Sequence, residues 1–345
     1  MYIEQAFKFK QDVWRYLLGI LIVFILGWQI IGVIPLGIVS WFKASNLEEF
    51  ITASESAFST LFPLKSNLYL FLMLLTFIGG FVALLVVIKF LHHQSFIQLT
   101  TSRDKIDWGR FFFGFGIIAF LTITTTAFDF YSNPENYLIQ FEWKSFSIMF
   151  LIAIVLIPLQ TSFEEYFFRG YLMQGIGIAV KNKWIPLLMT SIIFGSLHFF
   201  NPEVDKIGNI AMVYYIGTGF FLGIITLMDE GMELSLGFHA GTNLIIVLLV
   251  TSDWTVFQTN SILLDLSDPS KGIEVVLPVF ILYPILLGVM AWKYKWTNWK
   301  EKLFGKVLLL KKDSIYCFSA YLRLSPGSKY ATNAWVFTRS RAAAN

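Results

Sequence analysis

Long runs of apolar residues, separated by short polar segments, dominate the chain. The first run, residues 17–39, has Gln29 as its only strongly polar side chain, and the second, residues 68–88, carries no charge. A helix of about 20 apolar residues crosses the hydrocarbon core of a bilayer. Further apolar runs lie at residues 111–128, 147–159, 184–200, 211–228, 234–250 and 275–292. The pattern therefore predicts an all-α, polytopic membrane helix bundle with about eight transmembrane helices.

The composition supports this interpretation. Hydrophobic residues make up 56% of the 345 residues and charged residues only 14%, a balance far more apolar than that of a soluble domain. We expect an integral, multi-pass membrane protein whose partners include membrane lipid and no nucleic acid. The pattern does not identify which membrane. The single cysteine, Cys317, excludes an intrachain disulfide and a multi-cysteine metal site.

Lysine and arginine are distributed unevenly between alternate connections. If the N-terminus is cytoplasmic, the cytoplasmic segments hold most of these residues, including the run of lysines between residues 293 and 312. The external connections then hold only Lys43, Lys65, Lys144, Lys206 and Lys271. The positive-inside rule therefore predicts that the N-terminus and the C-terminus are both cytoplasmic. From about Asp313 the composition becomes mixed and polar, which predicts a poorly ordered tail.

Two carboxylates and a guanidinium stand among aromatic residues near the middle of a long helical segment, residues 147–180. Burying charge in a membrane is costly and calls for a reason. Glu165 and Arg169 are four residues apart, so they face one another on a helix and can neutralise each other. Glu164 points elsewhere and has no local cation, which suits a general base. The structural alternative is a salt-bridged helix end at the cytoplasmic interface.

Two further polar groups occur in later apolar segments. His198 lies near the middle or far end of an otherwise apolar helix, where a packing histidine held by hydrogen bonds is the common alternative to a catalyst. His239 and Asn243 share one helical face, and both can donate hydrogen bonds to a developing oxyanion. Interhelical hydrogen bonding is the alternative for this pair. Their joint presence with Glu164 on three helices favours a catalytic interpretation.

Two other features are interpreted as structural. His92 and His93 lie in a predicted cytoplasmic loop and are expected to be solvated. Gly217, Gly219 and Gly223 form a small-residue face that lets two membrane helices approach closely.

The order and spacing of these residues resemble a known family. Glu164-Glu165 with Arg169, Phe194 with His198, and His239 with Asn243 match the EExxxR, FxxxH and HxxxN motifs of the CAAX protease and bacteriocin-processing (CPBP) family. The resemblance covers roughly residues 150–250 and implies an intramembrane endopeptidase that acts on membrane-associated or lipidated proteins or peptides. It implies that Glu164 activates water with help from His198, while His239 and Asn243 stabilise the oxyanion. Glu165 and Arg169 would hold the first motif in shape.

The resemblance also bears on cofactors and on the division of the chain. Members of the family have been called metalloproteases, and Glu164, His198 and His239 could ligate zinc. No HExxH motif is present, so we favour water activation without a metal or other cofactor. We expect N-terminal helices in residues 1–146, a catalytic core with the last transmembrane helix in residues 147–293, and a basic segment with a tail in residues 294–345.

Two other classes of function remain open. A proton-coupled transporter could use an intramembrane glutamate and histidines as a relay, but it predicts internal repeats, and none is visible. A non-catalytic membrane immunity or scaffold protein of the same fold is the other alternative.

Overall fold

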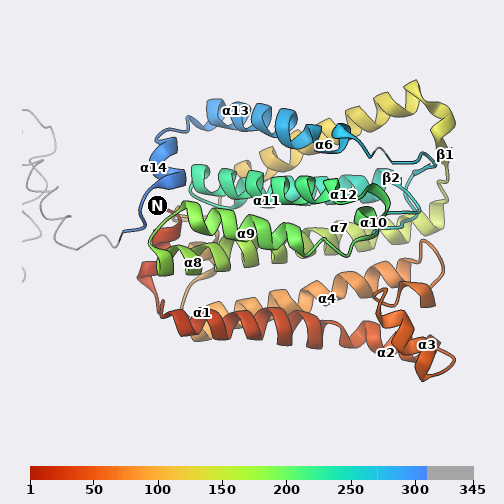
Figure 1. Cartoon of the computed structure of the whole chain (residues 1–345), viewed down its shortest axis with the longest axis horizontal. Helices are drawn as coiled ribbons and strands as arrows, with labels where there is room; N and C mark the ends of the chain where they lie inside the picture. The colour runs from red at the N-terminus through yellow and green to blue at the C-terminus, as the bar shows by residue number, and fades with distance from the viewer. Residues whose placement is uncertain (270, 309–345) are drawn as a thin grey trace, which may run out of the picture. The chain divides into compact units, whose positions relative to one another are not determined.

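The computed structural model describes residues 1–269 and 271–308. The predicted tail from Asp313 onward and Cys317 lie outside the described residues. Met1–Val307 form one compact unit, in which helices predominate, as the apolar runs predicted (Figure 1). The apolar runs do not indicate a small sheet made of β1 (Tyr137–Ile139), β2 (Val250–Thr251) and β3 (Leu263–Asp265). The strand order is β1-β3-β2, with β3 antiparallel to β1 and parallel to β2.

The N-terminal part of this unit consists of three long helical segments. In the first, α1 (Val13–Ile20) continues through a π-helical stretch, Leu21–Gly32, to α2 (Ile34–Lys43). The short helix α3 (Leu47–Ser54) leads to α4 (Asn67–Val86), which a π-helical turn extends to Leu91. After α5 (Phe96–Thr100) comes α6 (Trp108–Ser132). Two of these helices begin at a side chain that accepts a backbone N–H group: Ser66 caps α4 and Asp107 caps α6.

The remaining helices carry the polar residues of interest. The longest segment runs from α7 (Trp143–Glu165) through a π-helical stretch, Tyr166–Leu172, to α8 (Met173–Val180). It is followed by α9 (Trp184–Ser196), α10 (Pro202–Ile207), α11 (Ile210–Asp229) and α12 (Glu233–Leu249). The last two helices of the described residues are α13 (Tyr283–Tyr294) and α14 (Trp299–Phe304). Non-glycine residues with positive φ, such as Lys181 at +55° and Glu230 at +60°, end α8 and α11.

Among the described residues, six helical segments are long and apolar enough to cross a membrane. They are Val13–Lys43, Asn67–Leu91, Trp108–Ser132, Trp143–Val180, Ile210–Asp229 and Ile273–Tyr294. The other two predicted spans correspond to α9, with 13 residues, and α12, with 17. At 1.5 Å per residue, α9 extends only about 20 Å. The predicted number of eight spans and the sides on which the termini lie therefore stay predictions.

Glycines permit the closest helix contacts. A Cβ atom added to Gly237 of α12 would stand 1.9 Å from the carbonyl oxygen of Phe111 in α6, so the two backbones touch. On α11, Gly219 lies against Ser191 and Gly223 against Leu187, both in α9. These contacts confirm the interpretation of the α11 glycines as a packing face. The α6 contact also fixes the helix that carries His239 and Asn243.

Ion pairs with two buried carboxylates, Asp229 and Glu233, hold the turn between α11 and α12 in place. Arg103 donates to Asp229 at 2.6 Å and to Glu233 at 3.2 Å. Arg110 adds a second cation at 2.8 Å from Asp229, and the indole of Trp296 donates to the same carboxylate at 3.0 Å. These contacts hold the end of α11 and the start of α12 against the first turn of α6 and the segment before it.

The expectation that His92 is solvated is wrong. Its side chain is 1% exposed, and its ring nitrogens lie 2.8 Å from the carbonyl oxygen of Lys10 and 2.9 Å from the hydroxyl of Tyr171. The N-terminal segment and the π-helical stretch Tyr166–Leu172 cover this ring, a long-range contact that the local sequence does not reveal. His93 is exposed, as expected.

Candidate active site

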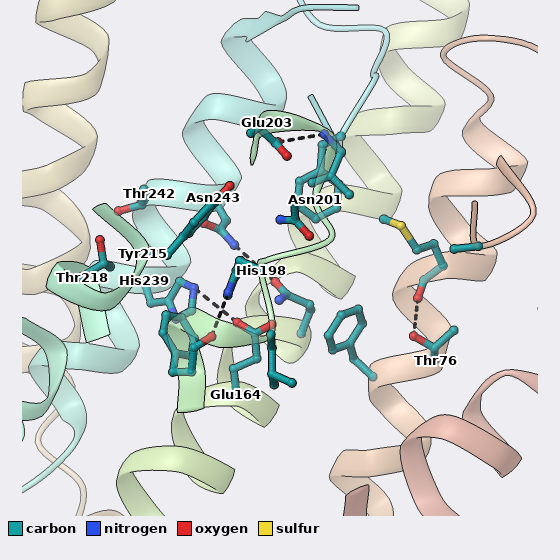
Figure 2. Close-up of a pocket in the computed structure, with 18 of the residues that line it drawn as sticks. Thr76, Glu164, His198, Asn201, Glu203, Tyr215, Thr218, His239, Thr242 and Asn243 are labelled. Atoms are coloured by element: carbon teal, nitrogen blue, oxygen red, sulfur yellow. Dashed lines mark hydrogen bonds and ion pairs between the residues drawn. The ribbon is translucent and has the colours of Figure 1, made fainter. Parts of the chain in front are cut away.

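A cavity of about 590 Å³ lies among the helices and brings together the four predicted catalytic residues. Glu164 comes from α7, His198 from the turn after α9, and His239 and Asn243 from α12. Figure 2 shows their side chains directed into the same space. Most of the remaining lining is apolar or aromatic, and part of it comes from the N-terminal helices, including Trp28 and Phe77. Residues far apart in the sequence therefore form one polar site in an apolar cavity.

Glu165 and Arg169 lie behind this cavity and are fully buried. Arg169 Nη1 donates to Glu165 Oε1 at 2.9 Å, as the four-residue spacing predicted. Arg169 Nη2 also donates to the carbonyl oxygen of Gly219 at 3.3 Å, and its guanidinium lies 4.2 Å from the ring centroid of Phe194. The pair therefore links α7 to α9 and α11. These contacts are compatible with the supporting role expected for these two residues, which stays a prediction.

His239 connects the buried pair to the cavity. Its Nδ1 lies 2.8 Å from Glu165 Oε1, and its Nε2 lies 3.5 Å from Glu164 Oε2. Since a carboxylate accepts hydrogen bonds, Nδ1 donates to Glu165 and the ring is held with Nε2 toward Glu164. The sequence spacing gave no sign of this contact, because Glu165 and His239 are 74 positions apart.

His198 has a defined orientation. Its Nδ1 lies 2.9 Å from the carbonyl oxygen of Phe194, one helical turn earlier, so Nδ1 must carry the proton. The ring stacks on Tyr215, with centroids 4.4 Å apart. In the neutral imidazole, Nε2 then has a free lone pair, which can accept a proton from water or from a substrate.

Sequence reasoning missed several polar residues of the cavity. Gln160 lies one turn before Glu164 on α7, and its Oε1 accepts a hydrogen bond from Asn243 Nδ2 at 3.4 Å. Asn201, Glu203 and Tyr215 also line the cavity. The four-residue spacing of Gln160 and Glu164 was a usable signal, whereas Glu203 lies in a short segment whose place against the cavity depends on the fold.

The donor set does not form a metal cluster. In the part of the chain that the structure describes, no group of three or more His, Cys, Asp or Glu side chains is placed to hold a metal ion. His239 donates from Nδ1 to Glu165, and its Nε2 lies 3.5 Å from Glu164 Oε2. The expected activation of water without a metal and the alternative zinc set of Glu164, His198 and His239 both stay predictions, and no chemical step is assigned to a metal.

The helices and the cavity together define a membrane-embedded bundle with acid–base residues in its interior. Residues 143–245 match the model of the family described as type II CAAX prenyl endopeptidase Rce1-like. This segment, which contains all seven motif residues, matches that protease family, so the resemblance to CAAX proteases is confirmed. The chain is accordingly an integral, multi-pass membrane protein.

A curated relative extends this similarity beyond the matched segment. YyaK of Bacillus subtilis (strain 168), an uncharacterized protein, is 29% identical over 218 residues, which cover 63% of this chain and 73% of that protein. No solved structure matches the chain significantly.

Proposed function

We propose that the chain is an intramembrane endopeptidase that hydrolyses peptide bonds of membrane-associated or lipidated proteins or peptides. The observation that carries this proposal is the convergence of Glu164, His198, His239 and Asn243 from three segments on one cavity. A carboxylate and a neutral imidazole can activate water, and two donors can hold an oxyanion. Membership of residues 143–245 in a protease family supports the same reaction.

In the proposed reaction, Glu164 removes a proton from water, which His198 Nε2 orients. The water oxygen attacks the carbonyl carbon of the scissile peptide bond, and the carbonyl oxygen becomes an oxyanion. His239 Nε2 and Asn243 Nδ2 donate hydrogen bonds to that oxygen. The proton held by Glu164 then passes to the leaving nitrogen, the C–N bond breaks, and a carboxylic acid and an amine result.

The contacts of His239 constrain its protonation in this scheme. Because Nδ1–H is engaged by Glu165, Nε2 can donate to an oxyanion only if the ring is an imidazolium. Glu164, Glu165 and Arg169 together carry one net negative charge, which an imidazolium neutralises. The cluster of four groups is then electrically balanced, as a buried site requires.

Gln160 is a positioning residue in the same scheme. Its Oε1 accepts one of the two Nδ2 hydrogens of Asn243 and leaves the other for the oxyanion. This contact orients the amide so that its nitrogen, and not its oxygen, is the group presented to the substrate.

A cleavage assay tests the proposal. The purified full-length chain, in detergent, would be incubated with a library of apolar peptides, free and lipidated, with and without a strong chelator. We expect cleavage that the chelator leaves intact. Absence of cleavage of every peptide by a folded preparation would contradict the proposed function. Cleavage lost together with stoichiometric zinc, and restored by zinc, would show that a metal activates the water.

A further inference from the structure

The cavity contains a second carboxylate that the proposed chemistry does not use. Glu203 is the second residue of α10, five positions after His198, and it lines the cavity together with Glu164. In the view of Figure 2, His198 lies between the two glutamates. The described lining residues include these two glutamates and neither a lysine nor an arginine.

The two oxygens of Glu203 have different surroundings. Oε1 accepts the backbone N–H of Val256 at 2.8 Å, which ties α10 to the loop after β2. Oε2 is buried and has no hydrogen-bond partner among the described residues. Burial raises the pKa of this carboxyl group above its ordinary value. A buried carboxylate oxygen without a donor costs free energy unless something binds it.

The nearest lysine in the sequence does not supply that partner. Lys206, three residues further along α10, forms an ion pair with Asp268 at 2.9 Å instead. The free-energy cost of burying the Glu203 carboxylate is therefore not offset by an ion pair with a lysine of the same helix. A cation that enters the cavity would complete the site.

We propose that Glu203 binds an ammonium group of the substrate peptide, which makes this residue a determinant of specificity. This inference rests on the proposed function and adds a substrate class to it. One free oxygen suits a compact ammonium better than the planar guanidinium, which binds carboxylates best through two oxygens. The ammonium belongs to a lysine side chain or to a free peptide N-terminus. In either case it binds on the far side of His198 from the scissile bond.

The alternative is that Glu203 has only a structural role, in which it accepts the Val256 N–H and holds the loop after β2 in place. Glu203→Gln separates the two roles, because the amide oxygen can still accept the Val256 N–H while the charge is removed. Glu203→Lys reverses the charge. Glu135→Gln, at an exposed position outside the cavity, is the matched control.

The test compares peptides in which lysine or norleucine is placed at each position in turn, with the N-terminus free or acetylated. For the wild type and for Glu135→Gln we expect one position, or the free N-terminus, to raise kcat/KM about tenfold, the effect of one ion pair worth about 1.4 kcal/mol. Glu203→Gln should abolish this preference while it still cleaves the norleucine peptide. Glu203→Lys should prefer glutamate at the same position.

The outcomes separate this inference from the proposed function. If Glu203→Gln cleaves with the wild-type preference, or if the wild type has no preference for an ammonium, Glu203 has only the structural role and the inference is wrong. If the wild type cleaves no peptide, the equilibrium affinity for the same lysine and norleucine peptides decides the inference. Tighter binding of the lysine peptide that Glu203→Gln abolishes supports it, and equal binding overturns it.

Discussion

The carboxylate of Glu165 contacts the guanidinium of Arg169 and the imidazole of His239, so its negative charge stabilises both side chains. Arg169 and His239 donate to the same oxygen, Oε1. Glu164, by contrast, faces the cavity and contacts His239 at the longer distance of 3.5 Å. The adjacent glutamates therefore differ in environment, which supports different roles for them.

Replacing Glu165 with Gln should destabilise the protein. The change leaves Arg169 buried without a counter-charge, and breaking a buried ion pair commonly costs about 3 to 5 kcal/mol. Thermal unfolding in detergent, with Glu135→Gln as an exposed control, measures the effect. We also expect lower turnover in whatever folds, because a neutral amide holds the His239 ring in place less strongly than the carboxylate does. A stable protein without any activity would mean that Glu165, and not Glu164, is the base.

His92 should make stability depend on pH. Burial lowers the pKa of its ring from the ordinary value of 6.5. Below about pH 6.5 the unfolded chain therefore binds a proton that the folded chain does not, so the free energy of unfolding falls as the pH falls. This loss continues until the folded His92 is protonated. His92→Gln should unfold with a weaker dependence on pH between about 7 and 5, and an unchanged dependence would contradict this account.

The sequence singled out four polar residues that the fold brings to one cavity and predicted the ion pair of Glu165 with Arg169, but it did not indicate the contacts between helices. Glu164, His198, His239 and Asn243 were identifiable because polar groups are rare in apolar helices. The link between Glu165 and His239, the burial of His92 and the place of Glu203 against Val256 all join residues distant in sequence. Contacts of this kind depend on how the helices pack, which residue spacing within one helix cannot show.

At the scale of helices, the contact between α6 and α12 positions the proposed oxyanion donors, His239 and Asn243. Gly237 stands two residues before His239, and a Cβ there would overlap the carbonyl oxygen of Phe111. Apolar length predicted both helices, but it could not predict that α9 would be as short as 13 residues or that three short strands would form. Those features arise where the chain turns at the ends of helices, and their pairing partners are remote in the sequence.

Gly237→Ala should separate α12 from α6. We expect a lower unfolding temperature and reduced turnover, since the shift moves His239 and Asn243 relative to Glu164. Gly116→Ala on α6 is the matched control, because a Cβ there meets nothing within 4 Å. The control should be neutral or stabilising by up to about 1 kcal/mol, given the better helix propensity of alanine. Equal effects of the two changes would contradict the proposed importance of this contact.

At the scale of the whole molecule, α10 and the small sheet lie at the opposite end of the helices from α14 and the N-terminus (Figure 1). Together with the distribution of lysine and arginine, this arrangement favours cytoplasmic termini and an external α10. Single cysteines at the exposed positions Asp205 and Lys300, in a Cys317→Ser background, should react with a membrane-impermeant reagent from opposite sides of sealed vesicles. Reaction of both from one side would contradict the predicted topology.

The central claim is that the Glu164 carboxylate activates water, and Glu164→Gln tests it most directly. The variant keeps the size of the side chain and most of its hydrogen bonding but cannot accept the proton. We predict that turnover of a peptide cleaved by the wild type falls by about a hundredfold to ten-thousandfold. The unfolding temperature should stay close to that of the wild type, and Glu135→Gln should cleave normally. A folded Glu164→Gln protein with wild-type turnover would contradict the account.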